Sequence, residues 1–170
     1  MKTFFGSIML LGSSAFASPC IQGPGQVTCS EGTVQSLTAT GIASMSKTKF
    51  EEQVEIFGQV NANSCEFAQL KVHGNAKINN SNLNSEAYIY GLLEMHASQA
   101  YKTINIFSNQ AFLQGSNTKD IIIDGQDHPT ITLDNTTVDG DIKFDGNPGI
   151  VKCPDKCAIK GNIINGKLKN

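Results

Sequence analysis

The stretch Val54–Ala62, with the sequence VEIFGQVNA, decides the fold because small or apolar residues occupy every second position. That alternation is the period of a β-strand with one buried face. Its centre recurs along the chain as Ala39-Thr-Gly41, Ile56-Phe-Gly58, Val72-His-Gly74, Ile89-Tyr-Gly91, Ile106-Phe-Ser108, Ile123-Asp-Gly125 and Val138-Asp-Gly140. A repeat this short cannot bury a core alone, so we expect neighbouring copies to stack on one another.

The spacing of the copies predicts the architecture. They begin 15 to 17 residues apart, and an eighth copy, Ile159-Lys-Gly161, follows after 21 residues. The sequence therefore predicts an all-β, single-domain, right-handed parallel β-helix (β-solenoid). We expect seven to eight coils of about 16–17 residues each.

Aligning the copies on their first residue gives columns that we expect to point inward and to stack at about 4.8 Å. Four positions later stand Ala43, Val60, Ala76, Leu93 and Ile142. Six positions later stand Met45, Ala62, Ile78, Met95, Phe112 and Phe144. Nine positions later stand the small residues Cys65, Ser81, Ser98 and Gly115. This last column indicates a tight inward corner of each coil.

The N-terminus has the features of a secretory signal. Lys2 supplies a positive start, the run 4–11 is apolar, and Ala15-Phe16-Ala17 is a small-x-small cleavage site. We expect residues 1–17 to be removed, so that the mature chain begins near Ser18 in the periplasm or outside the cell. No later run is long enough for a transmembrane segment.

We divide the expected mature chain into three parts. Residues 18–33 form a disulfide-bearing N-terminal cap, and residues 34–144 form the regular solenoid coils. Residues 145–170 form a C-terminal coil and a cap with a disulfide loop. The turn Asp145-Gly-Asn-Pro-Gly149 marks the beginning of this last part.

Composition argues against one class of partner. The formal net charge is −2, and the 13 basic residues are all lysines. Specific nucleic-acid recognition relies on arginine forks and a basic face, so we expect no nucleic acid as partner. Trp is absent, which weakens the commonest stacking surface for sugars without removing it.

The cysteines predict two disulfides. Export permits disulfide bonds, and two close pairs, Cys20–Cys29 and Cys153–Cys157, flank the repeats. Each would close a short loop over one end of the solenoid. A zinc site needs four ligands, and the second pair offers two with no matching pair nearby. Cys65 is left as a free thiol, either a small buried residue of its column or a reactive or intermolecular thiol.

An aromatic column is the first candidate site. The position after the repeating aliphatic residue holds Phe57, His73, Tyr90 and Phe107, and Tyr88 precedes Tyr90 on the same face. In a strand these side chains point outward when their neighbours point inward. Exposed apolar patches often mark binding, here to a polysaccharide, a partner protein or a second copy. Such rings also stabilise a sheet by stacking alone, and a terminal segment folding over them is a further alternative.

An acidic cluster is the second candidate site. Asp124 and Asp139 share one position of the repeat, and Asp141 follows two residues later. Clustered carboxylates bind Ca²⁺, and a carboxylate pair at a defined separation cleaves glycosides. Asp-Gly is equally typical of solvated turns, so Ca²⁺ is the one cofactor that we consider. We assign no catalytic residue.

Short, glycine-punctuated repeats with this alternation resemble the bactofilin-type polymer-forming repeats over about residues 34 to 166. The resemblance implies a right-handed, three-faced β-helix that serves as a scaffold without catalysis. The export signal and the cysteine-bearing ends depart from that pattern. We therefore expect an exported, non-enzymatic β-solenoid with a structural or binding role in adhesion or scaffolding. The alternative is a small carbohydrate-active enzyme, a glycoside hydrolase or lyase, that uses the Asp cluster.

Overall fold

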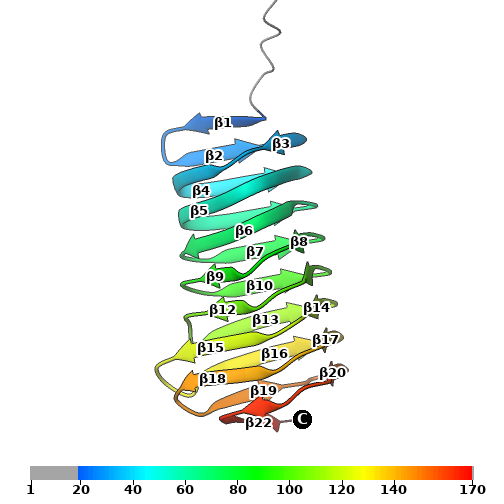
Figure 1. Ribbon diagram of the computed structural model, residues 1–170. Helices are drawn as coiled ribbons and strands as arrows, with labels where there is room; N and C mark the ends of the chain where they lie inside the picture. The colour runs from blue at the N-terminus through cyan, green and yellow to red at the C-terminus, as the bar shows by residue number, and fades with distance from the viewer. Residues whose placement is uncertain (1–18, 170) are drawn as a thin grey trace, which may run out of the picture.

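The computed structural model describes residues 19–169, and every regular element in that range is a β-strand. The coils stack along one axis into a β-solenoid of about eight turns, which Figure 1 shows from its blue N-terminal end to its red C-terminal end. The predicted all-β solenoid is therefore confirmed. The expected signal segment, residues 1–17, lies outside the described residues.

Strand pairing gives each coil three faces, and three long strands, β4 (Leu37–Ser46), β5 (Thr48–Asn63) and β6 (Glu66–His73), bend around corners between them. The first face continues with β9 (Ala87–Ile89), β12 (Ile104–Ile106), β15 (Ile121–Gly125), β18 (Ile142–Gly146) and β21 (Ile163–Ile164). The second face contains β1 (Cys20–Gly23), β2 (Gln26–Cys29), β7 (Ala76–Asn79), β10 (Leu93–His96), β13 (Gln110–Gln114), β16 (Thr130–Asp134), β19 (Gly149–Lys152) and β22 (Gly166–Lys169). The third contains β3 (Gly32–Val34), β8 (Asn82–Leu83), β11 (Gln99–Ala100), β14 (Asn117–Thr118), β17 (Thr136–Val138) and β20 (Cys157–Ile159).

The core lies along the axis, between the three faces. On the first face, one inward column runs through Leu37, Val54, Leu70, Ala87, Ile104, Ile121, Ile142 and Ile163. All of these side chains except the half-buried Ile163 are buried. Each coil buries apolar surface against the coils above and below, and that burial is the main force holding the stack together.

The glycine of the repeat is required by a close backbone approach. Gly41, Gly58, Gly74 and Gly91 follow one another at the first corner, with φ between 100° and 157°. A Cβ added at Gly58 would lie 2.0 Å from the carbonyl oxygen of Gly41 in the preceding coil. Only glycine permits both this dihedral and this contact, which explains the aliphatic-x-Gly motif.

A ladder of small polar residues forms the corner between the second and third faces. Its members are Thr48, Cys65, Ser81, Ser98, Ser116 and Thr136. The Ser98 hydroxyl accepts the Ser81 N–H at 3.0 Å and donates to the His96 carbonyl oxygen at 2.7 Å. Cys65 occupies one place in this ladder, where burial raises the pKa of its thiol.

The alignment of the last copies is wrong. Ile123 pairs with Phe144, whereas Val138 lies on the third face and pairs with Thr118 and Ile159. Ile142 and Phe144 therefore belong to the first-face columns. From Ile121 to Ile142 the coil has 21 residues, because the corner after β15 holds a longer loop and the corner after β17 also holds one residue more than its equivalent in the preceding coil.

One residue of slip also changes the predicted columns of the preceding coil. Met95 pairs with Leu113, so Leu113 points inward and Phe112 is 41% exposed. Likewise Ser116, and not Gly115, enters the corner ladder. The corner between β12 and β13 carries one residue more than the corners before it, and a shift of one residue turns each side chain to the opposite face of a strand.

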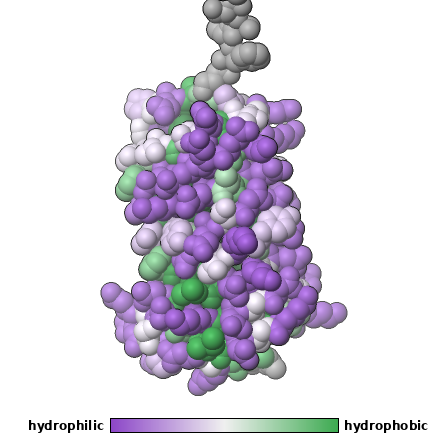
Figure 2. All heavy atoms as spheres, viewed as in Figure 1, coloured by the Kyte–Doolittle hydropathy of each residue, from purple (hydrophilic) through white to green (hydrophobic). Residues whose placement is uncertain are grey.

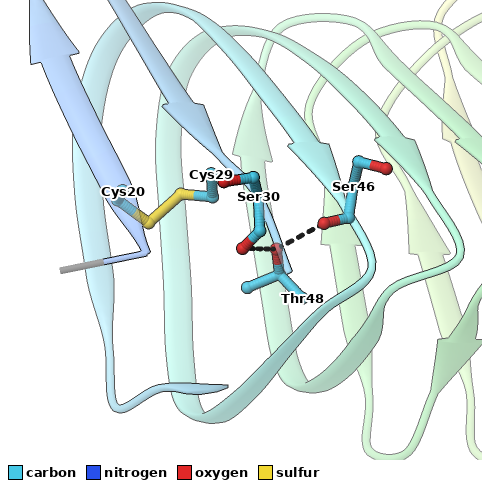
Figure 3. The surroundings of a disulfide bond; sticks show 5 residues. All are labelled: Cys20, Cys29, Ser30, Ser46 and Thr48. Atoms are coloured by element: carbon cyan, nitrogen blue, oxygen red, sulfur yellow. Dashed lines mark hydrogen bonds between the residues drawn. A yellow bond between two sulfur atoms is a disulfide. The ribbon is translucent and has the colours of Figure 1, made fainter. Parts of the chain in front are cut away.

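The two ends of the solenoid differ. At the N-terminal end, β1 folds back antiparallel on β2, and a disulfide joins Cys20 to Cys29 across this hairpin. Figure 3 shows this disulfide beside Thr48, whose hydroxyl donates to the Ser46 and Ser30 carbonyl oxygens. At the other end, Cys153 and Cys157 form the second expected disulfide.

Candidate functional site

Four rings form a continuous stack on the outside of the first face, and we call them the aromatic ladder. The ring centroids of Phe57 and His73 are 4.4 Å apart, those of His73 and Tyr90 4.9 Å, and those of Tyr90 and Phe107 4.4 Å. Adjacent ring planes are within 6° of parallel. The structure therefore brings together four of the five residues of the expected aromatic column.

Parallel register explains the ladder. Each ring follows an inward aliphatic side chain of the first face and precedes the glycine or serine of the corner, so each points outward at the same height of its coil. Phe57, Tyr90 and Phe107 are 44%, 40% and 38% exposed. Because each ring covers the face of the next, what remains accessible along the ladder is mainly ring edges.

A polar column runs beside the ladder on the same face. It contains Glu55, Lys71, Tyr88 and Asn105, in register on successive coils. Glu55 accepts hydrogen bonds from Lys71 and from His73, both at 3.0 Å, and these bonds lower the pKa of the Glu55 carboxyl. The carboxylate thus holds the histidine of the ladder in place.

Tyr88, the fifth residue of the expected aromatic column, belongs to this polar column instead of the ladder. Its hydroxyl donates to the Glu86 carboxylate at 2.5 Å, and this bond raises the pKa of the Tyr88 phenol. The side chain therefore offers the site an amphipathic neighbour, with an apolar ring beside Tyr90 and a polar end fixed by Glu86.

The ladder ends in a pocket of about 360 Å³ at Phe107. Its lining is Phe107, Ser108, Asn109, Asp124, Gly125 and Gln126. The wall is fixed by the Asn109 amide oxygen, which accepts the N–H groups of Gln126 at 2.8 Å and Asp127 at 3.3 Å. A side-chain amide of Asn147, one coil further, donates to the Gln126 carbonyl oxygen.

Sequence reasoning missed Ser108, Asn109 and Gln126 as parts of a site. The available signal was the change in repeat length after Ile123, which places an extra loop at one corner. In Figure 1 this loop, which follows β15, projects from the left side of the stack.

The three aspartates predicted as a cluster do not form one site, because they lie on different parts of the coil and have different partners. Asp124 pairs in register with Asp145 on the first face. Asp139 lies beyond β17 on the third face, where an ion pair of 2.7 Å with Lys160 lowers the pKa of its carboxyl. The alignment that placed Asp124 beside Asp139 is therefore wrong.

Asp141 has a structural role that is visible in its contacts. Its carboxylate accepts the N–H of Asn162 at 2.7 Å in the final coil, and its own N–H donates to Asp120. Within residues 19–169, no three His, Cys, Asp or Glu side chains converge in a way that could hold a metal ion.

The disulfides and the character of the surface are relevant to the cellular location of the protein. Figure 2 shows a largely hydrophilic face, with hydrophobic side chains gathered over the C-terminal coils. Two disulfides indicate an oxidising, extracellular type of environment. No helix long and apolar enough to cross a bilayer occurs in the part of the chain that the structure describes.

Comparison with protein-family models, with curated proteins and with solved structures finds no significant match. The resemblance to bactofilin-type repeats therefore consists of the repeat pattern and the general β-solenoid architecture.

Proposed function

We propose that this chain is an exported, non-enzymatic β-solenoid that binds a polysaccharide through the aromatic ladder and the polar column beside it. The observation that carries the proposal is the ladder itself, four outward rings in register on one face. Exposed apolar groups beside hydrogen-bonding groups are typical of ligand sites. The two disulfides support an extracellular location.

The period of the fold supports an extended ligand. Successive coils repeat at about 4.8 Å, so outward side chains at the same position of the coil form a regular linear array along the axis. Glu55, Lys71, Tyr88 and Asn105 repeat at the same interval beside the rings. A polysaccharide lying along the axis would therefore meet a regular series of polar groups and ring edges.

One observation favours a second candidate, a protein partner or a second copy of the chain. The stacked rings expose edges, and a narrow stripe of ring edges suits an apolar protein surface as well as a sugar. A scaffold or adhesion role follows equally from either ligand.

The positions of the predicted aspartates do not support the enzyme alternative. A glycoside hydrolase or lyase that uses Asp124, Asp139 and Asp141 needs a carboxylate pair across one cleft. Asp124 and Asp139 occupy different faces, and Asp139 is already paired with Lys160. We therefore do not propose this activity.

The test is a polysaccharide and glycan array with residues 18–170, with Ca²⁺ and with a chelator. We expect saturable binding that Tyr90→Ser removes, because the substitution interrupts the ladder at its centre. Tyr101→Ser is the control, since Tyr101 is 48% exposed on the third face. Calcium dependence would show that a cation takes part.

Absence of glycan binding, or equal binding by the Tyr90→Ser variant, would contradict the proposal. The far-ultraviolet circular dichroism spectrum of each variant must match that of the parent protein. If no glycan binds, cross-linking at the ladder tests the protein-partner candidate directly.

A further inference from the structure

The ladder has two end rings, and these have different surroundings. Phe57 and Phe107 each have one ring face against a neighbour in the stack. The other face of Phe57 is directed to the coil of Thr40, whereas that of Phe107 is directed to the coil of Asp124. A pocket adjoins the ring of Phe107. Sugars stack on ring faces, so the ladder offers a stacking site at this end.

The pocket at Phe107 carries hydrogen-bonding groups that the fold leaves available. The Asp124 carboxylate and the Gln126 side-chain amide make no hydrogen bond or ion pair within residues 19–169. Asn109 accepts with its amide oxygen only, so its amide nitrogen remains available to a ligand. Such groups around one aromatic face are the usual composition of a small-ligand site.

The charge of the pocket limits the kind of sugar that fits. Asp124 has Asp145 in register one coil further, and Asp127 follows in the same loop. Lys143, which lies on the same face, forms an ion pair with Asp145 at 3.2 Å. A carboxylate ligand would meet like charge here, whereas a neutral or cationic ring would not.

We propose that this pocket binds the terminal pyranose of a neutral or amino sugar, with its apolar face against the part of the Phe107 ring that lines the pocket and its hydroxyl groups bonded to Asp124 and Gln126. The proposal deepens the polysaccharide-binding function and assumes it. The ladder would then contact the chain along its length, and the pocket would hold its end. A polymer of uronic acids would be rejected.

The experiment is a titration of the ¹⁵N-labelled mature chain, followed by amide NMR. The probes are methyl β-D-glucopyranoside, the methyl glycoside of glucosamine and the methyl glycoside of glucuronic acid. We expect saturable shifts at Asn109, Gly125 and Gln126 with the first two probes and none with the third. Shifts confined to other residues, or equal shifts with the uronate, would overturn the proposal.

Variants at the two ends of the ladder are matched. Phe107→Leu should weaken binding about tenfold, because the stacking surface is lost. Phe57→Leu removes a ring of similar exposure, 44% against 38%, from the other end and should change the affinity by less than about twofold. Gln126→Ala tests the pocket without altering the ladder, and it should also weaken binding. Equal loss in the Phe57 and Phe107 variants would contradict a site at one end.

The two proposals fail in different ways. If Tyr90→Ser abolishes polysaccharide binding on the array while no pocket amide responds to the glycosides, the pocket proposal is wrong and the proposed function stands. If the pocket amides respond while Tyr90→Ser binds polysaccharide normally, the ladder is not the binding surface.

Discussion

At the scale of single residues, the first corner depends on glycine. The Cβ of Gly58→Ala would lie 2.0 Å from the Gly41 carbonyl oxygen, at a φ of 146°. We expect a loss of about 3 kcal/mol or more in the free energy of unfolding, from strain and overpacking together. Urea unfolding followed by circular dichroism measures this loss.

Gly25→Ala is the matched control for that prediction. Gly25 also has a positive φ, of 67°, but a Cβ there would meet nothing within 4 Å. The cost should therefore be limited to the dihedral, about 1 kcal/mol. Equal costs at the two positions would show that the close backbone approach is not the limiting factor.

Glu55 links the polar column to the ladder, and its titration should be measurable. Hydrogen bonds from Lys71 and His73 lower the pKa of the folded carboxyl below its ordinary value of 4.5. The group therefore contributes stability that is fully present above that value and is lost as the pH falls through the lower pKa of the folded state. The contribution should be small because the site is solvated.

Urea midpoints measured across this pH range test the effect. The Glu55→Gln variant should be less stable than the parent at neutral pH, and the difference should shrink at acid pH. Glu66→Gln is the control, since Glu66 makes no ion pair in the described chain. A difference that is independent of pH would contradict the assigned role.

At the scale of elements, the β1–β2 hairpin lies at the N-terminal end of the described stack, and its disulfide should stabilise it locally. Closing a loop with a sequence separation of 9 corresponds to about 2–3 kcal/mol in the chain-entropy account. In a stack where each coil contacts its neighbours only, that loss should remain near the end. The paired change Cys20→Ala with Cys29→Ala should speed amide hydrogen exchange in β2 and β4, and leave β13 and β16 unchanged.

The corresponding pair at the other end is a control for position. Cys153→Ala with Cys157→Ala should affect exchange in β20 and β22 and leave β2 protected. Faster exchange throughout the molecule in either variant would show that the stack unfolds as one cooperative unit.

Sequence alone predicted the elements well where the coils are uniform. Between Leu37 and Leu93 the coils differ by at most one residue in length, so a single alignment placed the predicted inward columns of the first two faces correctly. It failed from Phe112 onward, because corner loops grow without any change in the strand pattern. Val138-Asp-Gly140 has the aliphatic-x-Gly sequence of the first-face motif, yet Val138 lies on the third face. Repeat matching has no means of distinguishing one strand of a coil from another.

At the scale of the whole molecule, the candidate site was predictable only in part. The ladder follows from the alternation of residues and from parallel register, so Phe57, His73, Tyr90 and Phe107 could be grouped from the sequence. The pocket requires Asn109 and Gln126 to meet across consecutive coils at a corner whose length had changed. That meeting depends on loop conformation, which local pattern does not encode.

The short sequence separation of paired strands has a consequence for the order of folding. Every parallel pair joins residues only 16 to 21 positions apart, as in Leu70 with Val54 and Ile163 with Ile142. A coil therefore needs nothing but the coil before it in order to form. A chain that emerges from its N-terminus can therefore fold coil by coil, starting from the β1–β2 hairpin, before its last residues have emerged.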